Sequence, residues 1–149
     1  MISDAEVVLR LLLSVILSGL VGLEREAKGR AAGFRTHILV CLGSTLIMLT
    51  GVYMAEHYRG LGVEMDPSRL AAQVVSGIGF LGAGTIIQFR DSVRGLTTAA
   101  SVWAASGVGL AVGAGFYLGA AASTVIVLVV LHALHSFETR VSAKAKPQN

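Results

Sequence analysis

Five apolar stretches, each about as long as a membrane-spanning helix, constrain what this chain can fold into. A helix that crosses the hydrocarbon core of a bilayer needs about 20 predominantly apolar residues, within a range of roughly 17–25. Arg10 is the only charged residue within the stretches, which cover residues 7–23, 36–55, 70–89, 98–114 and 118–134. Charged residues make up 14% of the chain, against about 25% in a typical soluble domain. We therefore expect an all-helical membrane protein with residues 1–135 as its transmembrane domain.

The basic residues indicate which side of the membrane each connection faces, because Lys and Arg collect on the cytoplasmic side. Nine of them lie in the connections around residues 22–37 and 89–97 and in the tail 136–149, whereas the opposite connections hold only Arg59 and Arg69. This bias predicts an N terminus outside, a cytoplasmic C terminus and a short basic tail at the membrane surface. It also accounts for the net charge of +3, so we expect the lipid bilayer and no nucleic acid as a partner.

Six charged residues crowd the first predicted cytoplasmic loop, over residues 22–37. They are Glu24, Arg25, Glu26, Lys28, Arg30 and Arg35. Orientation requires only the positive charges, so the two acidic residues need another explanation. Either they pair with nearby arginines and hold the two cytoplasmic loops together, or the loops form a binding surface for phosphate, nucleotide or a partner protein.

Both cytoplasmic loops end in a similar four-residue step, Gly33-Phe-Arg-Thr36 and Gly95-Leu-Thr-Thr98. We expect each threonine to cap the helix that follows, because its hydroxyl can accept from free backbone N–H groups. Arginines beside these helix starts would favour an anion or a carboxylate. The candidate functional surface therefore comprises Glu24, Arg25, Glu26, Arg30, Arg35, Thr36, His37, Arg94, Thr97 and Thr98.

An offset of 62 residues aligns the first predicted helix pair with the second without a gap. It places Gly22 on Gly84, Gly33 on Gly95 and Thr36 on Thr98, among other small residues. Both pairs would share one orientation, as in parallel repeats related by an axis along the membrane normal. Small residues are common in membrane helices, so the alignment predicts either a true repeat or a coincidence.

Glycines recur at helical spacing in the third and fourth apolar stretches. Three of them form G-x-G-x-x-G, but the dinucleotide fingerprint requires a preceding strand and a following acid, and both are missing here. Small residues instead allow membrane helices to approach closely, although a locally unwound helix lining a polar cavity is the alternative. The glycines expected to pack are Gly77, Gly79, Gly82, Gly84, Gly109 and Gly113.

Polar side chains within the predicted spans are few. Arg10 lies one turn into the first span, and we expect it to extend outward to the interface. Gln73 is an amide within the third span, and one hydrogen bond to another helix would explain it.

Candidate metal ligands lie outside the spans. Mg²⁺ usually takes carboxylate oxygens, and Glu24, Glu26 and Asp91 could meet it at the cytoplasmic mouth, so a magnesium ion is the only cofactor considered. His132 and His135 share a helix face, but two histidines without a third ligand favour interface residues over a metal site. No nucleophile–base–acid set is evident, so we do not expect an enzyme.

These motifs together resemble the MgtC/SapB family of bacterial inner-membrane proteins, from about Leu12 to about Leu118. The matching segments are Gly22-Leu-Glu-Arg-Glu26, Ala32-Gly-Phe-Arg-Thr-His-Ile-Leu-Val40, Val75-Ser-Gly-Ile-Gly-Phe-Leu-Gly-Ala-Gly-Thr85, and Val93-Arg-Gly-Leu-Thr-Thr-Ala-Ala100 with Trp103.

The resemblance implies an inner-membrane protein linked to magnesium limitation and ATP homeostasis. It implies a regulator that contacts another membrane complex, such as the rotary ATP synthase. A cation transporter formed by a homo-oligomer is the alternative, and a homo-oligomer is expected in either case. The virulence members of the family carry a C-terminal cytoplasmic domain. For this chain we expect a short form that has only the tail. They also have Asn where this chain has Thr97.

Overall fold

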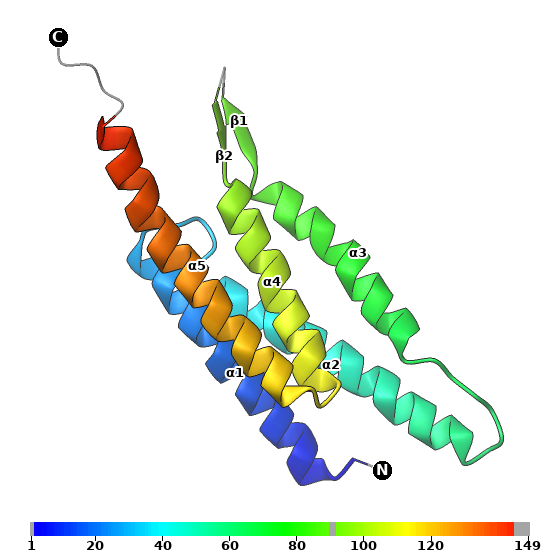
Figure 1. Cartoon of the computed structure of the whole chain (residues 1–149). Helices are drawn as coiled ribbons and strands as arrows, with labels where there is room; N and C mark the ends of the chain where they lie inside the picture. Colours follow the sequence, from blue (N-terminus) through cyan, green and yellow to red (C-terminus); the bar gives the residue numbers. More distant parts are fainter. Residues whose placement is uncertain (1, 90–91, 145–149) are drawn as a thin grey trace.

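Five helices and one small hairpin make up the protein, in a computed structural model that describes residues 2–89 and 92–144, with the backbone alone for Phe89 and residues 134–144. The predicted all-helical polytopic class is confirmed (Figure 1). Three helices, α1, α2 and α4, are long and apolar enough to cross a membrane. The elements are α1 (Asp4–Ala27), α2 (Phe34–Arg59), α3 (Ser68–Gly84), β1 (Ile87–Phe89), β2 (Ser92–Arg94), α4 (Leu96–Gly113) and α5 (Tyr117–Lys144).

The first predicted loop is mostly helix. Helix α1 continues to Ala27 and α2 begins at Phe34, so only residues 28–33 connect them. Glu24, Arg25 and Glu26 therefore lie on the last turns of α1. Arg, Glu and Ala favour helices, and the chain leaves the helix just before Gly29, which has a positive φ of 62°.

The second predicted loop is a β-hairpin. Helix α3 ends at Gly84, five residues before the end of the predicted span, and Ile87 pairs with Arg94 in an antiparallel ladder. The base of the hairpin depends on Gly95, which has φ 91° and contacts the Thr85 carbonyl oxygen so closely that a Cβ could not fit. Only glycine suits both the left-handed backbone and this approach.

Helix α5 extends through most of the predicted tail. Its helical backbone reaches Lys144, while residues 145–149 lie outside the described part. The sequence from Ser136 to Lys144 contains neither Gly nor Pro, so the helix meets no breaking residue there. The position of this segment at the membrane surface stays a prediction.

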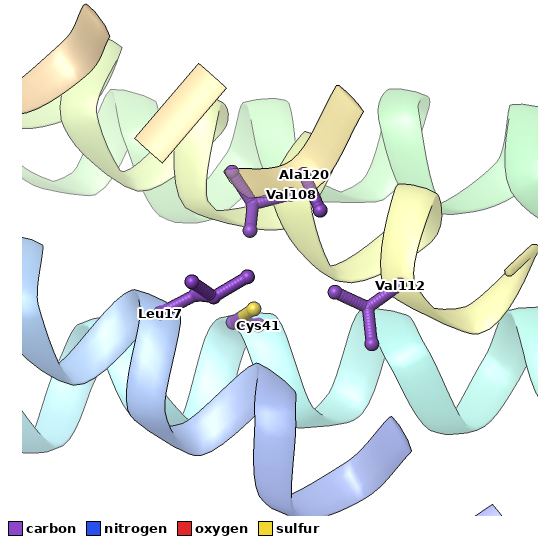
Figure 2. Packing of buried hydrophobic residues seen from close by; sticks show 5 residues of the cluster. All are labelled: Leu17, Cys41, Val108, Val112 and Ala120. Carbon is purple, nitrogen blue, oxygen red and sulfur yellow. The ribbon is translucent and has the colours of Figure 1, made fainter. Parts of the chain in front are cut away.

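The core is formed by small residues where α1, α2, α4 and α5 meet. Figure 2 shows its buried cluster, whose members come from all four helices: Leu17, Cys41, Val108, Val112 and Ala120. Many larger apolar side chains point outward instead, among them Leu12, Ile16, Leu39, Phe80 and Ile126. Outward apolar side chains and a small-residue interior are the arrangement expected of a bundle in lipid.

Two of the six predicted packing glycines lie at a very close approach between α4 and α2. A Cβ at Gly109 would collide with the Cys41 carbonyl oxygen, and one at Gly113 would lie 2.8 Å from the Thr45 carbonyl oxygen. The Thr45 hydroxyl donates to the Gly109 carbonyl at 2.9 Å. The two helices therefore touch through their backbones.

The glycines of α3 behave differently. A Cβ added at Gly77, Gly79 or Gly84 would meet no atom of the described residues within 4 Å, and one at Gly82 would make an ordinary contact of 3.7 Å with Ala99. The expected packing at these first three positions therefore has no partner within the described chain.

The aligned helix pairs of the proposed repeat have different surroundings. A Cβ at Gly22 would lie 2.7 Å from the Phe34 Cα, whereas its aligned counterpart Gly84 faces open space among the described residues. Gly33 lies against Glu26, but its counterpart Gly95 lies against the Thr85 carbonyl. The order of the elements is consistent with two helix pairs, α1–α2 and α3–α4. The repeat itself stays a prediction.

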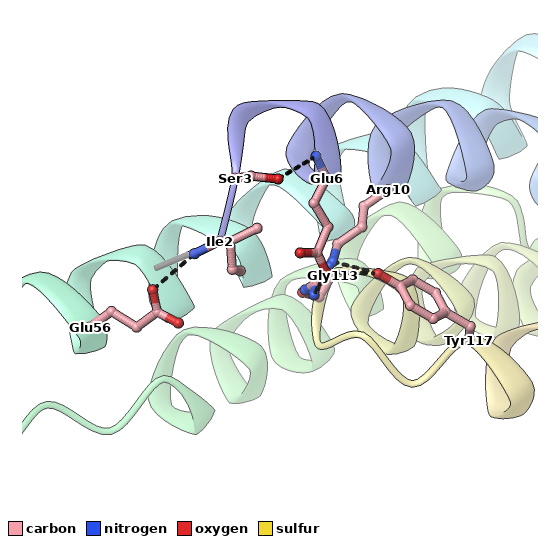
Figure 3. A network of polar contacts seen from close by, with 7 residues as sticks. All are labelled: Ile2, Ser3, Glu6, Arg10, Glu56, Gly113 and Tyr117. Carbon is pink, nitrogen blue, oxygen red and sulfur yellow. Dashed lines mark hydrogen bonds and ion pairs between the residues drawn. The ribbon is translucent and has the colours of Figure 1, made fainter.

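Arg10 points into the protein, contrary to the prediction that it extends outward. It is only 8% exposed; its Nε donates to the Tyr117 hydroxyl at 2.8 Å and its Nη1 to the Gly113 carbonyl at 2.7 Å (Figure 3). Glu6, one turn earlier, pairs with the same guanidinium. Because carbonyls in the last turn of a helix lack helical partners, Arg10 caps α4 and ties α1 to α4 and α5.

We predict that Gly109→Ala destabilises the bundle by about 1–3 kcal/mol, since the new methyl group overpacks a backbone contact. The matched control is Gly107→Ala, because Gly107 is exposed on the same helix and has open space around it in the described structure. Unfolding midpoints in detergent micelles measure the difference. Equal midpoints for the two variants would contradict the close approach of α2 and α4.

Arg10→Met is predicted to lower the free energy of unfolding by about 1–3 kcal/mol, because it leaves the buried Gly113 carbonyl without its donor. Tyr117→Phe removes only one of the arginine's partners and should cost less. The control Arg59→Met changes an exposed arginine at the end of α2 and should leave stability within about 0.5 kcal/mol. An Arg10 variant as stable as this control would show that the cap contributes nothing.

Candidate functional site

The two predicted cytoplasmic loops lie side by side in the fold. A hollow of about 360 Å³ is lined by Ala31 and Thr36 from the first, by Gly84 and Thr85 before the hairpin, and by Phe80 of α3. Figure 1 shows the hairpin at the same end of the molecule as the C-terminal part of α5. We call this region, formed by residues 24–37, 84–89 and 92–98, the hairpin end.

The acidic residues of the hairpin end do not pair with Arg30, Arg35 or Arg94, and this prediction is wrong. Glu24 Oε1 lies 2.6 Å from Lys28 Nζ, one turn away on α1 and its continuation. Glu26 Oε2 accepts the backbone N–H of Phe34 at 2.7 Å. Each carboxylate has a nearer partner than these arginines. Glu24 meets Lys28 at helical spacing, and Glu26 meets the Phe34 N–H across the tight α1–α2 connection.

The expected threonine caps are also wrong. The helices begin at Phe34 and Leu96, preceded by Gly33 and Gly95, and neither start has a side-chain cap of its own in the described chain. Thr36 and Thr98 occupy the third helical positions, the first exposed and the second buried. The glycine conformations begin each helix two residues earlier, and Glu26 provides the acceptor at the start of α2.

Three arginines of the hairpin end remain available. Arg30, Arg35 and Arg94 are exposed, and the described residues give their guanidinium groups no ion pair or hydrogen bond. Thr97 is exposed beside them. Three cations from separate elements therefore face solvent without a counter-charge among the described residues.

Arg25 is turned inward instead. It is 3% exposed, its Nη1 lies 3.6 Å from Glu24 Oε2, and its Nε is buried without a hydrogen bond among the described residues. The two Glu24 oxygens are buried and lack hydrogen-bond geometry as well. The Lys28 ammonium that accompanies Glu24 also donates to the Leu131 carbonyl of α5 at 3.1 Å.

His37 lies in the core, although the sequence suggested a surface role. It is fully buried; its Nδ1 is 2.9 Å from the Gly33 carbonyl oxygen and its Nε2 is 3.1 Å from the Ser101 hydroxyl. A carbonyl only accepts, so Nδ1 carries a proton. Ser101 also lies 2.9 Å from the Thr98 carbonyl, and its single proton serves one of the two acceptors. The imidazole thus connects α2 to α4.

Ser101 is a polar contact that the sequence analysis missed. Its only signal is the pattern of small polar residues on α4, where Thr98, Ser101 and Ser106 all point inward. Nothing in that pattern identifies His37, which lies 64 residues away, as its partner.

The structure gives no separate support for a metal site. Glu24 and Glu26 are engaged as described, and Asp91 lies outside the described residues. Within residues 2–89 and 92–133, no group of three His, Cys, Asp or Glu side chains lies close enough to hold a metal ion. His132 is exposed in the middle of α5, and the side chain of His135 is outside the described part. A magnesium ion stays an expectation.

Known proteins share most of this sequence. The relative named "Putative magnesium transporter YhiD", from Escherichia coli K12, is 41% identical over 141 residues, which cover 94% of the chain and 66% of that protein. Protein SapB of Bacillus subtilis is 40% identical over 85% of the chain and 55% of its own length. Protein MgtC of Salmonella typhimurium is 41% identical over 81% of the chain and 49% of its own length.

The chain spans less than two thirds of the length of each of these three relatives. No solved structure matches it. The model of the MgtC family matches residues 11–140, which include α2, α3, α4, the hairpin end and most of α1 and α5. The chain therefore belongs to the MgtC family.

Proposed function

We propose that this chain is a bacterial inner-membrane regulator in magnesium homeostasis, which acts by binding another membrane complex through its hairpin end. The observation that carries the proposal is the exposed set of Arg30, Arg35 and Arg94, which lack partners among the described residues. Solvent-exposed cations gathered on one surface attract an acidic partner and orient it. The proposal includes magnesium because the similar protein YhiD is named a magnesium transporter.

The arrangement of these arginines supports a contact surface beyond a topology anchor. Arg30 and Arg35 each precede a residue that lines the 360 Å³ hollow, and Arg94 precedes Gly95, which contacts the lining residue Thr85. The nearby carboxylates of Glu24 and Glu26 are engaged elsewhere. Among the described residues, the positive charge around the hollow is therefore left unbalanced, and acidic side chains of a partner would balance it.

The partner in this proposal is the rotary ATP synthase, and regulation of ATP levels is the consequence. Both rest on the family resemblance of the segments that form the hairpin end. The orientation with this end in the cytoplasm rests on the excess of basic residues there.

We predict that Arg35→Glu with Arg94→Glu lowers recovery of ATP synthase subunits with the tagged full chain by at least about tenfold, since like charges then oppose acidic groups. The matched control is Arg59→Glu with Arg69→Glu. It reverses two exposed charges away from the hairpin end, at the last residue of α2 and the second residue of α3. Quantitative immunoblots of detergent-extracted membranes measure recovery. Unchanged recovery would exclude the arginines as the contact, and a wild-type sample without the synthase would exclude that partner.

A second candidate is magnesium transport by an oligomer. The name of YhiD favours it, and the buried carboxylate of Glu24, which Lys28 and Arg25 accompany, is the candidate ligand. Within one chain, however, the buried hydroxyls of Ser18 and Thr124 donate to carbonyls of their own helices. They line no described pore, so a conduction path would run between copies.

The regulator proposal predicts that liposomes containing the purified chain take up no more Mg²⁺ than empty liposomes, at any membrane potential imposed. A magnesium-sensitive dye inside the vesicles measures uptake. Flux that falls at least about tenfold in Glu24→Gln, with Glu64→Gln as the exposed control, would replace the regulator with a transporter.

A further inference from the structure

The hollow of the hairpin end joins two surfaces of opposite character. On the side of α3 it is lined by Phe80 and Leu81, which are 83% and 52% exposed and belong to the outward apolar surface of the bundle. On the side of α2 it is lined by Thr36, which directly follows the exposed Arg35. One concave site therefore reaches from lipid-facing apolar side chains to positive charge.

The hollow lies at the depth where the first span ends. The first apolar stretch stops at Leu23, and the charged residues of α1 begin again at Glu24. A Cβ added at Gly22, one residue before that end, would lie 2.7 Å from the Cα of Phe34. Phe34 begins α2 only two residues before Thr36 of the hollow. The hollow is therefore level with the boundary between hydrocarbon and headgroups.

Groups that attract an anion surround the hollow. The guanidinium groups of Arg30, Arg35 and Arg94 are exposed and have no ion pair or hydrogen bond among the described residues. Helix α4 begins directly after Gly95, which contacts the lining of the hollow, and no side chain of the described residues caps its start. The N–H groups and the dipole at a helix start also favour a negative charge. These groups together suit a phosphate.

Among anions, a phospholipid fits both parts of the site. Its phosphate matches the arginines, and its acyl chain matches the apolar side chains of Phe80 and Leu81. A free phosphate would leave the apolar part of the hollow without a ligand, and an acidic protein segment would place polar backbone against it. Basic pockets between transmembrane helices are typical binding sites for anionic headgroups.

We propose that the hollow binds one anionic phospholipid of the surrounding membrane. Its phosphate contacts Arg30, Arg35 and Arg94, and the start of one acyl chain lies against Phe80 and over Gly84, where an added Cβ would meet no described atom within 4 Å. An acidic partner of the regulator would meet the same arginines, so the lipid would compete with it. The lipid site does not rest on the proposed function, because its tests contain no such partner.

Native mass spectrometry of the purified full chain, released from detergent micelles with added lipid, measures lipid binding. The chain should bind phosphatidylglycerol about tenfold or more tightly than phosphatidylcholine, because each arginine near the headgroup favours the anionic lipid. Arg35→Gln with Arg94→Gln should remove this preference. The matched control is Arg59→Gln with Arg69→Gln, which neutralises two exposed arginines away from the hairpin end and should keep the preference.

Filling the hollow tests the place of the acyl chain. Gly84→Leu adds a side chain to the hollow without changing any charge, and should weaken phosphatidylglycerol binding about fivefold or more, since the acyl chain loses apolar contact. Gly79→Leu is the matched control, because Gly79 is equally open on α3 but does not line the hollow. Far-ultraviolet circular dichroism checks that every variant keeps its helices.

Four results would overturn the proposal. Equal affinity for the two lipids would exclude a headgroup site, and an equal loss of preference in both arginine double variants would reduce it to an effect of total charge. Equal binding by the Gly84 and Gly79 variants would leave the arginines to an acidic protein. Displacement of phosphatidylglycerol by an equal concentration of inorganic phosphate would assign the arginines to a soluble anion.

Discussion

The backbone contact between α2 and α4 is the interaction on which the rest of the structure depends. Lipid solvates apolar side chains as well as another helix does, so helices associate where their backbones can meet. Gly109 and Gly113 remove the side chains that would keep α4 away from Cys41 and Thr45. Helix α1 packs on this pair, and Arg10 then joins α1 to the end of α4 and the start of α5. Helix α3 lies outside this core, and the described residues leave a groove between it and α2.

The sequence predicts the fold class well, but it predicts the ends of the helices poorly. The apolar stretches identify all five helices, because length and composition decide what can lie in a bilayer. The starts of α2 and α4 depend on contacts made by Glu26 and Gly95 with residues elsewhere in the chain, and these contacts leave no local pattern. The direction of Arg10 follows from acceptors on Gly113 and Tyr117, more than 100 residues away.

The charge cluster of the sequence lies in the hairpin end, which stays the candidate site, but the predicted pairings fail. Glu24 takes the lysine one turn away, Glu26 takes a backbone N–H, and His37 enters the core. The two carboxylates and the imidazole are thus paired with local or buried groups. The arginines that remain exposed carry the proposed function for that reason, and counting charges along the sequence could not have separated them from Arg25.

The Arg10 network also bears on how the chain enters the membrane. During synthesis the N-terminal helix emerges first, and its arginine must enter the bilayer long before Gly113 and Tyr117 exist. A lone charge in hydrocarbon is costly. Glu6 lies one turn away on the same helix, and its pair with Arg10 requires no other helix. Helix α1 therefore contains its own counter-ion for Arg10, and α4 adds the Gly113 carbonyl as a second acceptor.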